Sequence, residues 1–235
     1  MINPKDIHVI LIGNNEVYNF YANMEIIRDN YEFGNDIWIS CIYNGDLNEL
    51  CSGARENNFI TLNENRGYQL GALDLYNKSF EVAKLVNRKY TLIMNFDVWI
   101  LDQNNFLGIF EGIQKDKHIG LGRNIEYGHP LTDICVFKTS HIPKYIRQEI
   151  LPERIENLHL TNMESFDILE EWFLCMMYEN NLYNSWYILK RDNHPRYRWT
   201  HSNSIMHEHD IYVKKKRLMS NNIFEGNLIK QIRSL

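Results

Sequence analysis

The feature that most constrains the fold is an alternation of strand-like and helix-like segments in the first half of the chain. It begins with Ile7–Ile12, an uninterrupted apolar run that is typical of a strand buried on both faces. Periodicity then predicts, in order, a helix at Val17–Tyr31, a strand at Asp36–Tyr43, a helix at Leu47–Glu56, a strand at Phe59–Leu62, a helix at Tyr68–Val86 and a strand at Tyr90–Met94. This order predicts an α/β fold with a mainly parallel central sheet flanked by helices.

The second half of the chain is less regular. It contains candidate helices at Phe106–Gln114 and Thr161–Glu179, and candidate strands at His118–Gly122, Asp133–Lys138 and Tyr187–Leu189. Thr161 and Glu164 fit a capping box at the start of the later helix. Residues 190–210 are polar and aromatic and have no clear period. Because no repeat or linker interrupts the chain, we expect one domain over residues 1–235 with an irregular C-terminal region.

Composition narrows the class of protein. A net charge of -5 argues against a general nucleic-acid binder. No apolar run approaches the roughly 20 residues of a membrane span, and residues 1–6 do not have the pattern of a signal peptide. Cys41, Cys135 and Cys175 lie among apolar residues, and no cysteine belongs to a CxxC pair. We therefore expect a cytoplasmic protein with neither a disulfide framework nor a zinc site.

A glycine-containing loop lies between the third predicted strand and the helix that follows it. Residues 63–72 include Gly67 and Gly71, which allow close approach of the backbone to a ligand, and the helix start favours an anion. The spacing differs from the dinucleotide-binding GxGxxG pattern. The alternative is an ordinary helix start in which Gly71 permits close packing of the helix on the sheet.

Polar residues also follow the fourth predicted strand. Asn95 and Asp97 come at its carboxyl end, the edge at which open α/β sheets bind ligands. A carboxylate in this place can hold a divalent cation that bridges phosphates. The alternative for Asp97 is that it caps a turn, and Asp102 is better explained as a capping or solvated residue.

The ordered combination of these motifs resembles the GT-A glycosyltransferases, in particular the inverting family 2. The resemblance covers about the first 105 residues, in the segments Ile7–Ile12, Asn44-Gly45-Asp46, Asn65-Arg66-Gly67 through Ala72, and Asn95-Phe96-Asp97. It implies a single GT-A (Rossmann-like) domain in which residues 1–105 bind a nucleotide sugar and residues 106–235 bind the acceptor. Asn95 departs from the family, which usually has an acid there, and an amide oxygen coordinates a cation without adding charge.

By this resemblance, a set of residues would surround the donor, a nucleoside diphosphate sugar. They are Gly13, Asn14, Asn44, Asp46, Asn65, Arg66, Gly67, Gln69, Ala72, Asn95 and Asp97. Arg66 would meet phosphate charge or remain a solvated arginine. Asp97 and the late histidine His201 would hold a divalent metal, Mn²⁺ or Mg²⁺, as cofactor, and His207-Glu208-His209 is the alternative metal cluster.

The resemblance also implies an acidic general base early in a late helix. The closest match is Glu170-Glu171. Alignment with the family favours Glu171, whereas a helical wheel favours Glu170, which borders the apolar stripe while Glu171 points further away. The alternative is that both are surface charges. Glu164 and Asp167 are weaker candidates, because acids are common in a first helical turn.

These observations predict transfer of a sugar to a hydroxyl of a glycan or lipid-linked acceptor, with inversion and a carboxylate base. A retaining glycosyltransferase and a sugar-nucleotide-binding module without catalysis remain alternatives. A nucleotidyltransferase is disfavoured, because the loop at Gly13–Glu16 lacks the glycine- and basic-rich character of that class. Lys214–Arg217 is either a solvated run or a contact with an anionic membrane surface, so peripheral membrane association stays open.

Overall fold

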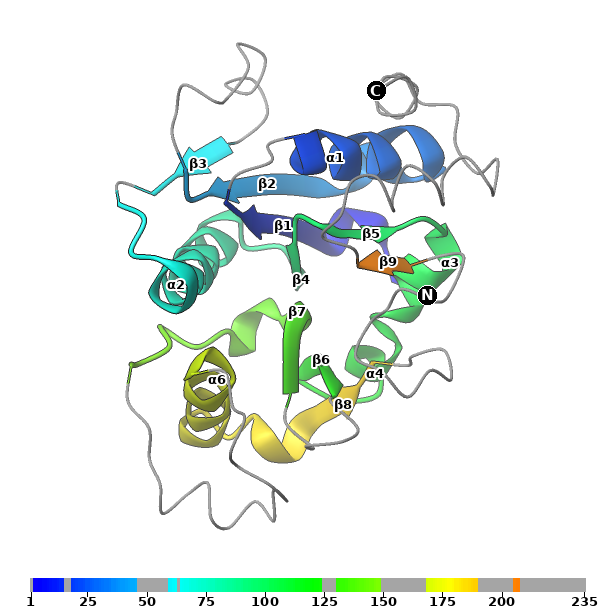
Figure 1. The fold of residues 1–235 in the computed structure, drawn as a ribbon. Coiled ribbons are helices and arrows are strands. Elements are labelled where there is room, and N and C mark those ends of the chain that lie inside the picture. The colour runs from blue at the N-terminus through cyan, green and yellow to red at the C-terminus, as the bar shows by residue number, and fades with distance from the viewer. Residues whose placement is uncertain are drawn as a thin grey trace.

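A computed structural model describes residues 2–14, 18–45, 59–62, 64–123, 130–148, 168–189 and 205–207 of the chain. Seven strands form one sheet in the order β3-β2-β1-β4-β7-β6-β8 (Figure 1). Their bounds are β1 Ile7–Gly13, β2 Trp38–Tyr43, β3 Phe59–Thr61, β4 Tyr90–Asn95, β6 Ile119–Arg123, β7 Pro130–Lys138 and β8 Trp186–Ile188. A separate two-stranded sheet pairs β5 (Val98–Ile100) with β9 (Ile205–His207).

Helices connect the strands and cover the sheet. The α-helices are α1 Tyr18–Asn30, α2 Tyr68–Val86, α3 Gln103–Gly108, α4 Glu111–Gln114 and α6 Ile168–Glu179. Short 3₁₀ helices are Pro4–Asp6, Gly34–Asp36, Thr139–His141 and Tyr183–Ser185. In the part of the chain that the structure describes, no helix has both the length and the hydropathy of a transmembrane span.

The sheet is mainly parallel, as the sequence predicts. The pairs β1–β2, β2–β3, β1–β4 and β6–β8 are parallel, whereas β7 is antiparallel to both of its neighbours, β4 and β6. Strand β7 is therefore the single strand of this sheet that runs against the others. The carboxyl ends of β1, β2 and β4 consequently meet at the edge where β7 begins.

Alternate residues of each central strand belong to two apolar layers. In β1, Ile7, Val9 and Leu11 pack in the layer formed with α1, α3 and α4, whereas Ile10 and Ile12 pack in the layer formed with α2 and α6. Figure 1 shows α2 and α6 next to each other, and α1 apart from both. Burial of both faces explains why β1 is apolar without alternation.

The predicted elements of the first half are confirmed within two residues where the structure describes them, and α2 has the predicted bounds. The predicted helix at Leu47–Glu56 and the Thr161–Glu164 capping box lie outside the described residues. The single helix predicted at Phe106–Gln114 is wrong. The Asp102 side chain caps α3 by accepting a 2.8 Å hydrogen bond from the Asn105 amide, so helix formation begins earlier, and Gly108 ends α3 before α4 begins.

Candidate functional site

The loops that follow β1, β2 and β4 lie side by side at the carboxyl edge of the sheet. The Asn44 amide donates to the Gly13 carbonyl (2.9 Å), and the Phe96 amide donates to the Ile12 carbonyl (2.8 Å). Gly13 pairs with Tyr43 in the parallel ladder. Three of the four motifs that the sequence singles out are thus adjacent in space, although up to 83 residues separate Gly13 from Phe96 (96 minus 13).

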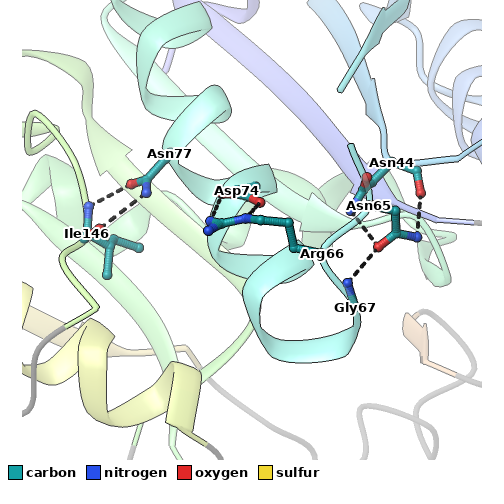
Figure 2. A network of polar contacts seen from close by, with 7 residues as sticks. All are labelled: Asn44, Asn65, Arg66, Gly67, Asp74, Asn77 and Ile146. Carbon is teal, nitrogen blue, oxygen red and sulfur yellow. Dashed lines mark hydrogen bonds and ion pairs between the residues drawn. The ribbon is translucent and has the colours of Figure 1, made fainter. Parts of the chain in front are cut away.

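A pair of asparagine side chains joins the end of β2 to the start of α2. The Asn44 Nδ2 donates to the Asn65 Oδ1 (3.2 Å), and the Asn65 Nδ2 returns a hydrogen bond to the Asn44 carbonyl (3.3 Å). The Asn65 Oδ1 also accepts from the amide of Gly67 (3.0 Å), the residue at the N-cap of α2. We call this arrangement the Asn44–Asn65 clasp (Figure 2). It fixes the fourth motif, the loop before α2, against the other three.

Gly71 is required by the clasp. A Cβ atom at this position would lie 2.8 Å from the Asn44 Nδ2 and 3.1 Å from the Asn65 Oδ1, closer than nearly all real Cβ contacts. The absence of a side chain at Gly71 therefore leaves room for the Asn44 and Asn65 amides. The sequence raised a different explanation, close packing of the helix on the sheet. Gly67 has a positive φ of 89°, which a glycine adopts without steric cost, and no described atom lies within 4 Å of its Cβ position.

Arg66, in the loop before α2, is paired with an acid of that helix, Asp74. Its Nε donates to Asp74 Oδ2 at 2.6 Å, and its NH2 group contacts Asp74 Oδ1. Figure 2 shows the Arg66 side chain alongside α2 and directed away from the clasp. Both side chains are partly exposed. In this structure, the Arg66 guanidinium therefore forms a bidentate ion pair with Asp74 and does not face the carboxyl edge of the sheet, where a phosphate would bind.

Helix α2 also holds the chain segment that follows β7. The Asn77 Nδ2 donates to the Ile146 carbonyl (3.2 Å), and the Asn77 Oδ1 accepts from the Ile146 amide (2.6 Å) (Figure 2). The side-chain amide of Asn77 thus makes both main-chain hydrogen bonds of Ile146, as a residue of a neighbouring strand would. The Lys84 Nζ donates to the Pro143 carbonyl (3.0 Å). The helix that opens at the clasp therefore also fixes the segment leading toward α6.

The loop after β4 is held from α1. The Asn23 Nδ2 donates to the Phe96 carbonyl at 2.6 Å, and the Phe96 ring stacks on Phe20 with a centroid distance of 5.3 Å. Asn95 is half-buried, and Asp97, which follows this turn, is 4% exposed. Burial of a carboxyl group is costly without compensating interactions, so the surrounding protein must stabilise the Asp97 carboxyl group, unlike that of a solvated surface residue.

The remaining predicted donor residues have ordinary positions near this edge. Asn14 directly follows β1, and Gln69 and Ala72 lie half-buried in the first turns of α2. Ala72 packs against the apolar layer of α2 and α6. Asp46 lies outside the described residues.

The C-terminal part of the chain reaches the same region through β9. In the antiparallel β5–β9 pair, Val98 is opposite His207. Since Val98 directly follows Asp97, the backbone of His207 is next to the predicted metal site. His201 and His209, the other histidines considered from the sequence, lie outside the described residues.

The first turn of α6 contains both candidate bases. Glu170 and Glu171 are half-buried, and the Thr132 hydroxyl donates to Glu170 Oε1 at 3.1 Å. Burial raises the pKa of Glu171 above its ordinary value. The helical wheel places Glu171 further from the apolar stripe than Glu170, yet both side chains are half-buried in the structure. A wheel represents one helix alone and does not include the neighbouring elements that cover its side chains.

The residues at the end of β4 offer a partial fit to a divalent cation. Asp97 supplies a carboxylate and Asn95 an uncharged amide oxygen, both of them ligand types that Mg²⁺ and Mn²⁺ accept. Among the described residues, no group of three His, Cys, Asp or Glu side chains gathers as a metal site. A cation here would need further oxygen ligands, and a diphosphate supplies such oxygens.

Sequence reasoning missed Asp74 and Thr132. Asp74 was not singled out because an acid in the second turn of a helix is common. Thr132 lies at the start of β7 and shows no motif of its own. A signal for Asp74 is its place six residues after Tyr68, the first residue of α2, where an acid can reach back to the Arg66 guanidinium before the helix start.

Comparison with known proteins gives a likeness of fold. No protein-family model matches the chain, and no curated protein sequence matches it. A solved structure from Desulfovibrio desulfuricans, provisionally named a nucleotide-diphospho-sugar transferase, superposes with a TM-score of 0.50 at 10% identity, covering 97% of this chain and 94% of that chain.

Two other solved structures superpose less closely. The glycosyltransferase GlyE of Streptococcus pneumoniae gives a TM-score of 0.45 at 12% identity over 78% of this chain, which spans 45% of the length of GlyE. The Drosophila β-1,4-galactosyltransferase 7 mutant in complex with manganese, UDP-Gal and xylobiose gives 0.46 at 9% identity, covering 89% of this chain and 73% of that chain. The architecture itself is clear: this chain has the α/β fold, with a seven-stranded and mostly parallel sheet, of the GT-A glycosyltransferase structures.

Proposed function

We propose that this protein is a glycosyltransferase that moves a sugar from a nucleoside diphosphate sugar to a hydroxyl group of a glycan or lipid-linked acceptor. The observation that supports this most is the convergence of the four sequence motifs at one edge of the sheet, with the Asn44–Asn65 clasp between them. Open α/β sheets bind ligands at this edge. The likeness of nearly the whole chain to the Desulfovibrio structure, provisionally named a nucleotide-diphospho-sugar transferase, agrees with the proposal at the level of fold.

The donor would occupy the carboxyl edge of β1, β2 and β4. Asn44, Asn65 and the start of α2 supply polar groups for the nucleotide, and the amides of a helix start favour a diphosphate. Asp97, with Asn95 beside it, would hold Mn²⁺ or Mg²⁺, and such an ion would neutralise charge on the leaving diphosphate. Asp46 and His201 remain proposed contacts for the nucleotide and the metal.

The acceptor side would contain the base. Of the two glutamates, we propose Glu171, because burial raises its pKa and so brings its proton affinity closer to that of a group working near neutral pH. The acceptor hydroxyl oxygen would attack the anomeric carbon while its proton passes to the Glu171 carboxylate. The bond from that carbon to the diphosphate oxygen would break, and its electron pair would leave on the diphosphate. The configuration at the anomeric carbon would be inverted.

The first experiment identifies the donor. Purified protein is heated with UDP, GDP, CDP or ADP, each with and without Mn²⁺, because a ligand that binds the native state raises Tm by mass action. A rise with at least one nucleotide is expected. If none of the four raises Tm or shows heat of binding by calorimetry, the proposed function is wrong.

The second experiment tests the base. With a nucleotide sugar of the nucleotide that the first experiment identifies, Glu171→Gln keeps the size of the side chain and removes its proton affinity, so kcat should fall by roughly 10²–10⁴-fold while donor Kd stays unchanged. A retaining enzyme needs no such base. Near-normal turnover of Glu171→Gln, with retained stereochemistry in the product, would favour that second candidate. Donor binding without any transfer would instead favour a sugar-nucleotide-binding module, for which the uncharged Asn95 is the supporting feature.

A further inference from the structure

A hydrogen bond between β7 and α6 separates the roles of the two neighbouring glutamates. The Thr132 hydroxyl donates to Glu170 Oε1 at 3.1 Å, across 38 residues of sequence. Thr132 is 6% exposed. The bond therefore joins a fixed strand residue to the first turn of the helix that also contains Glu171.

The main chain of Thr132 lies in an irregularity of the pairing between β6 and β7. Leu121 of β6 pairs with Cys135, but the next residue, Gly122, pairs with Leu131, so the register between the two strands shifts here and residues 132–134 form a bulge in β7. The Thr132 carbonyl accepts a hydrogen bond from the hydroxyl of Tyr76, a buried residue of α2. β-Bulges of this kind redirect side chains and are frequent next to active sites.

The bulge lies at the edge of the sheet where the donor would bind. Ile134 pairs with Met94, near the carboxyl end of β4. Because β7 is antiparallel to β4, the residues that precede Ile134 lie beyond Met94, toward Asn95 and Asp97. Thr132 thus brings the first turn of α6 to the same edge as the loop after β4.

We propose that Thr132 and Glu170 form a positioning pair, in which the Thr132 hydroxyl fixes the first turn of α6 through Glu170 and thereby aligns the neighbouring Glu171 carboxylate with the acceptor. This inference rests on the proposed function and adds to it a division of labour. Glu170 is a hydrogen-bond acceptor and Glu171 is the base. The distinction is chemical, because a glutamine at position 170 keeps an amide oxygen that accepts the same bond, whereas a glutamine at position 171 accepts no proton.

The test compares substitutions that separate hydrogen bonding from proton transfer. Thr132→Val removes the hydroxyl at nearly constant volume, and Thr132→Ser keeps it. Glu170→Gln keeps the acceptor, and Glu170→Ala removes it. The control is Thr139→Val. Thr139 directly follows the other end of β7, its hydroxyl is 2.8 Å from that of Thr91, and the residue is 5% exposed, so the same chemical loss occurs away from the site.

Thr132→Val and Glu170→Ala should each lower kcat by roughly 10- to 100-fold, since a misplaced catalytic group costs about this much. The double variant should be no worse than either alone. Thr132→Ser, Glu170→Gln and Thr139→Val should keep near-normal kcat, and the donor KM should be unchanged in all. If Glu170→Gln loses as much activity as Glu171→Gln was expected to lose, Glu170 is the base and the positioning role is wrong, although the enzyme still inverts.

Two further outcomes are also decisive. If Thr139→Val and Thr132→Val lower kcat equally, the effect is general destabilisation, and the positioning role is again wrong. If Glu171→Gln and Glu170→Gln both keep full activity, the proposed base itself is lost, which is a failure of the proposed function rather than of the Thr132–Glu170 pair alone.

Discussion

Substitution of Gly71 by alanine tests whether the Asn44–Asn65 clasp serves the donor. The new Cβ would lie 2.8 Å from the Asn44 Nδ2, whereas ordinary van der Waals contact begins at 3.4 Å, so the amide must move by about 0.6 Å. The two hydrogen bonds of the clasp are already 3.2 and 3.3 Å long. This movement takes the bond donated by the Asn44 Nδ2 out of hydrogen-bonding range. The Asn65 Oδ1, 3.1 Å from the new Cβ, must also shift by about 0.3 Å, which weakens the return bond from the Asn65 Nδ2 to the Asn44 carbonyl.

The expected effects on stability and on binding differ. Loss of one hydrogen bond of the clasp and weakening of the other cost about 1–3 kcal/mol, while replacing glycine by alanine within a helix contributes about 1 kcal/mol in the other direction. Tm should consequently change by only a few degrees, since about 1 kcal/mol corresponds to 2–4 °C in a protein of this size. The helix propensity of alanine does not offset the loss of donor binding in the same way. If the bound state needs the clasp, the affinity for the donor should fall by roughly 5- to 150-fold, which corresponds to the same 1–3 kcal/mol.

The assay is calorimetric titration of the nucleoside diphosphate that binds the wild-type protein. Gly108→Ala is the matched control, because Gly108 ends α3 and no described atom lies within 4 Å of its Cβ position. We expect weaker binding only for Gly71→Ala, together with nearly unchanged Tm in both variants. Equal nucleotide affinity in Gly71→Ala and the wild type would refute the reasoning, because the clasp would then be structural only.

Three other predictions follow from single residues. His8 is fully buried and bonded to Ser40 Oγ (2.9 Å), and burial, with the charge of Arg88, lowers its pKa from 6.5 to about 3. As the pH falls, the unfolded chain therefore binds a proton at this histidine before the folded protein does, so the folded state is fully stable above about pH 6.5 and loses stability below it. Urea denaturation should show the free energy of unfolding falling by about 2 kcal/mol between pH 7 and pH 5. His8→Asn should flatten this dependence, and a wild-type stability that does not change with pH would contradict the prediction. Asp97→Ala should abolish transfer at saturating donor without changing the circular dichroism spectrum, and full turnover would exclude Asp97 from the site. EDTA should suppress nucleotide binding, and Mn²⁺ should restore it in the wild type but not in Asp97→Asn; affinity that is unchanged by EDTA would argue against a cation.

The first half of the fold could be predicted because its elements are local and strongly patterned. The run at Ile7–Ile12 and the helix at Tyr68–Val86 are long enough for periodicity to define them. The three-residue strands β5 and β9 could not be predicted. Each becomes a strand only by pairing with a segment more than one hundred residues away, and no local pattern shows such a pairing.

The candidate site could be predicted as a set of loops but not as a set of contacts. The motifs at Asn44, Asn65 and Asp97 follow predicted strands, and a parallel sheet necessarily places such loops at one edge. The partner of Arg66 could not be anticipated, because both a phosphate and a neighbouring acid satisfy a guanidinium. The bulge at Thr132 likewise arises from the register between β6 and β7, which depends on contacts that no local pattern contains.

The pairing of β5 with β9 has a consequence for the order in which the chain can fold during its synthesis. Val98 emerges 109 residues before its partner His207 (207 minus 98). At ribosomal rates of about 5–20 residues per second, β5 waits for β9 for roughly 5–20 s. Strands β1, β2, β3 and β4 can meanwhile assemble with their own neighbours. The docking of β9 beside Asp97 would then follow the assembly of these four strands, so that a nascent chain acquires this part of its sheet well before the segment that lies beside Asp97.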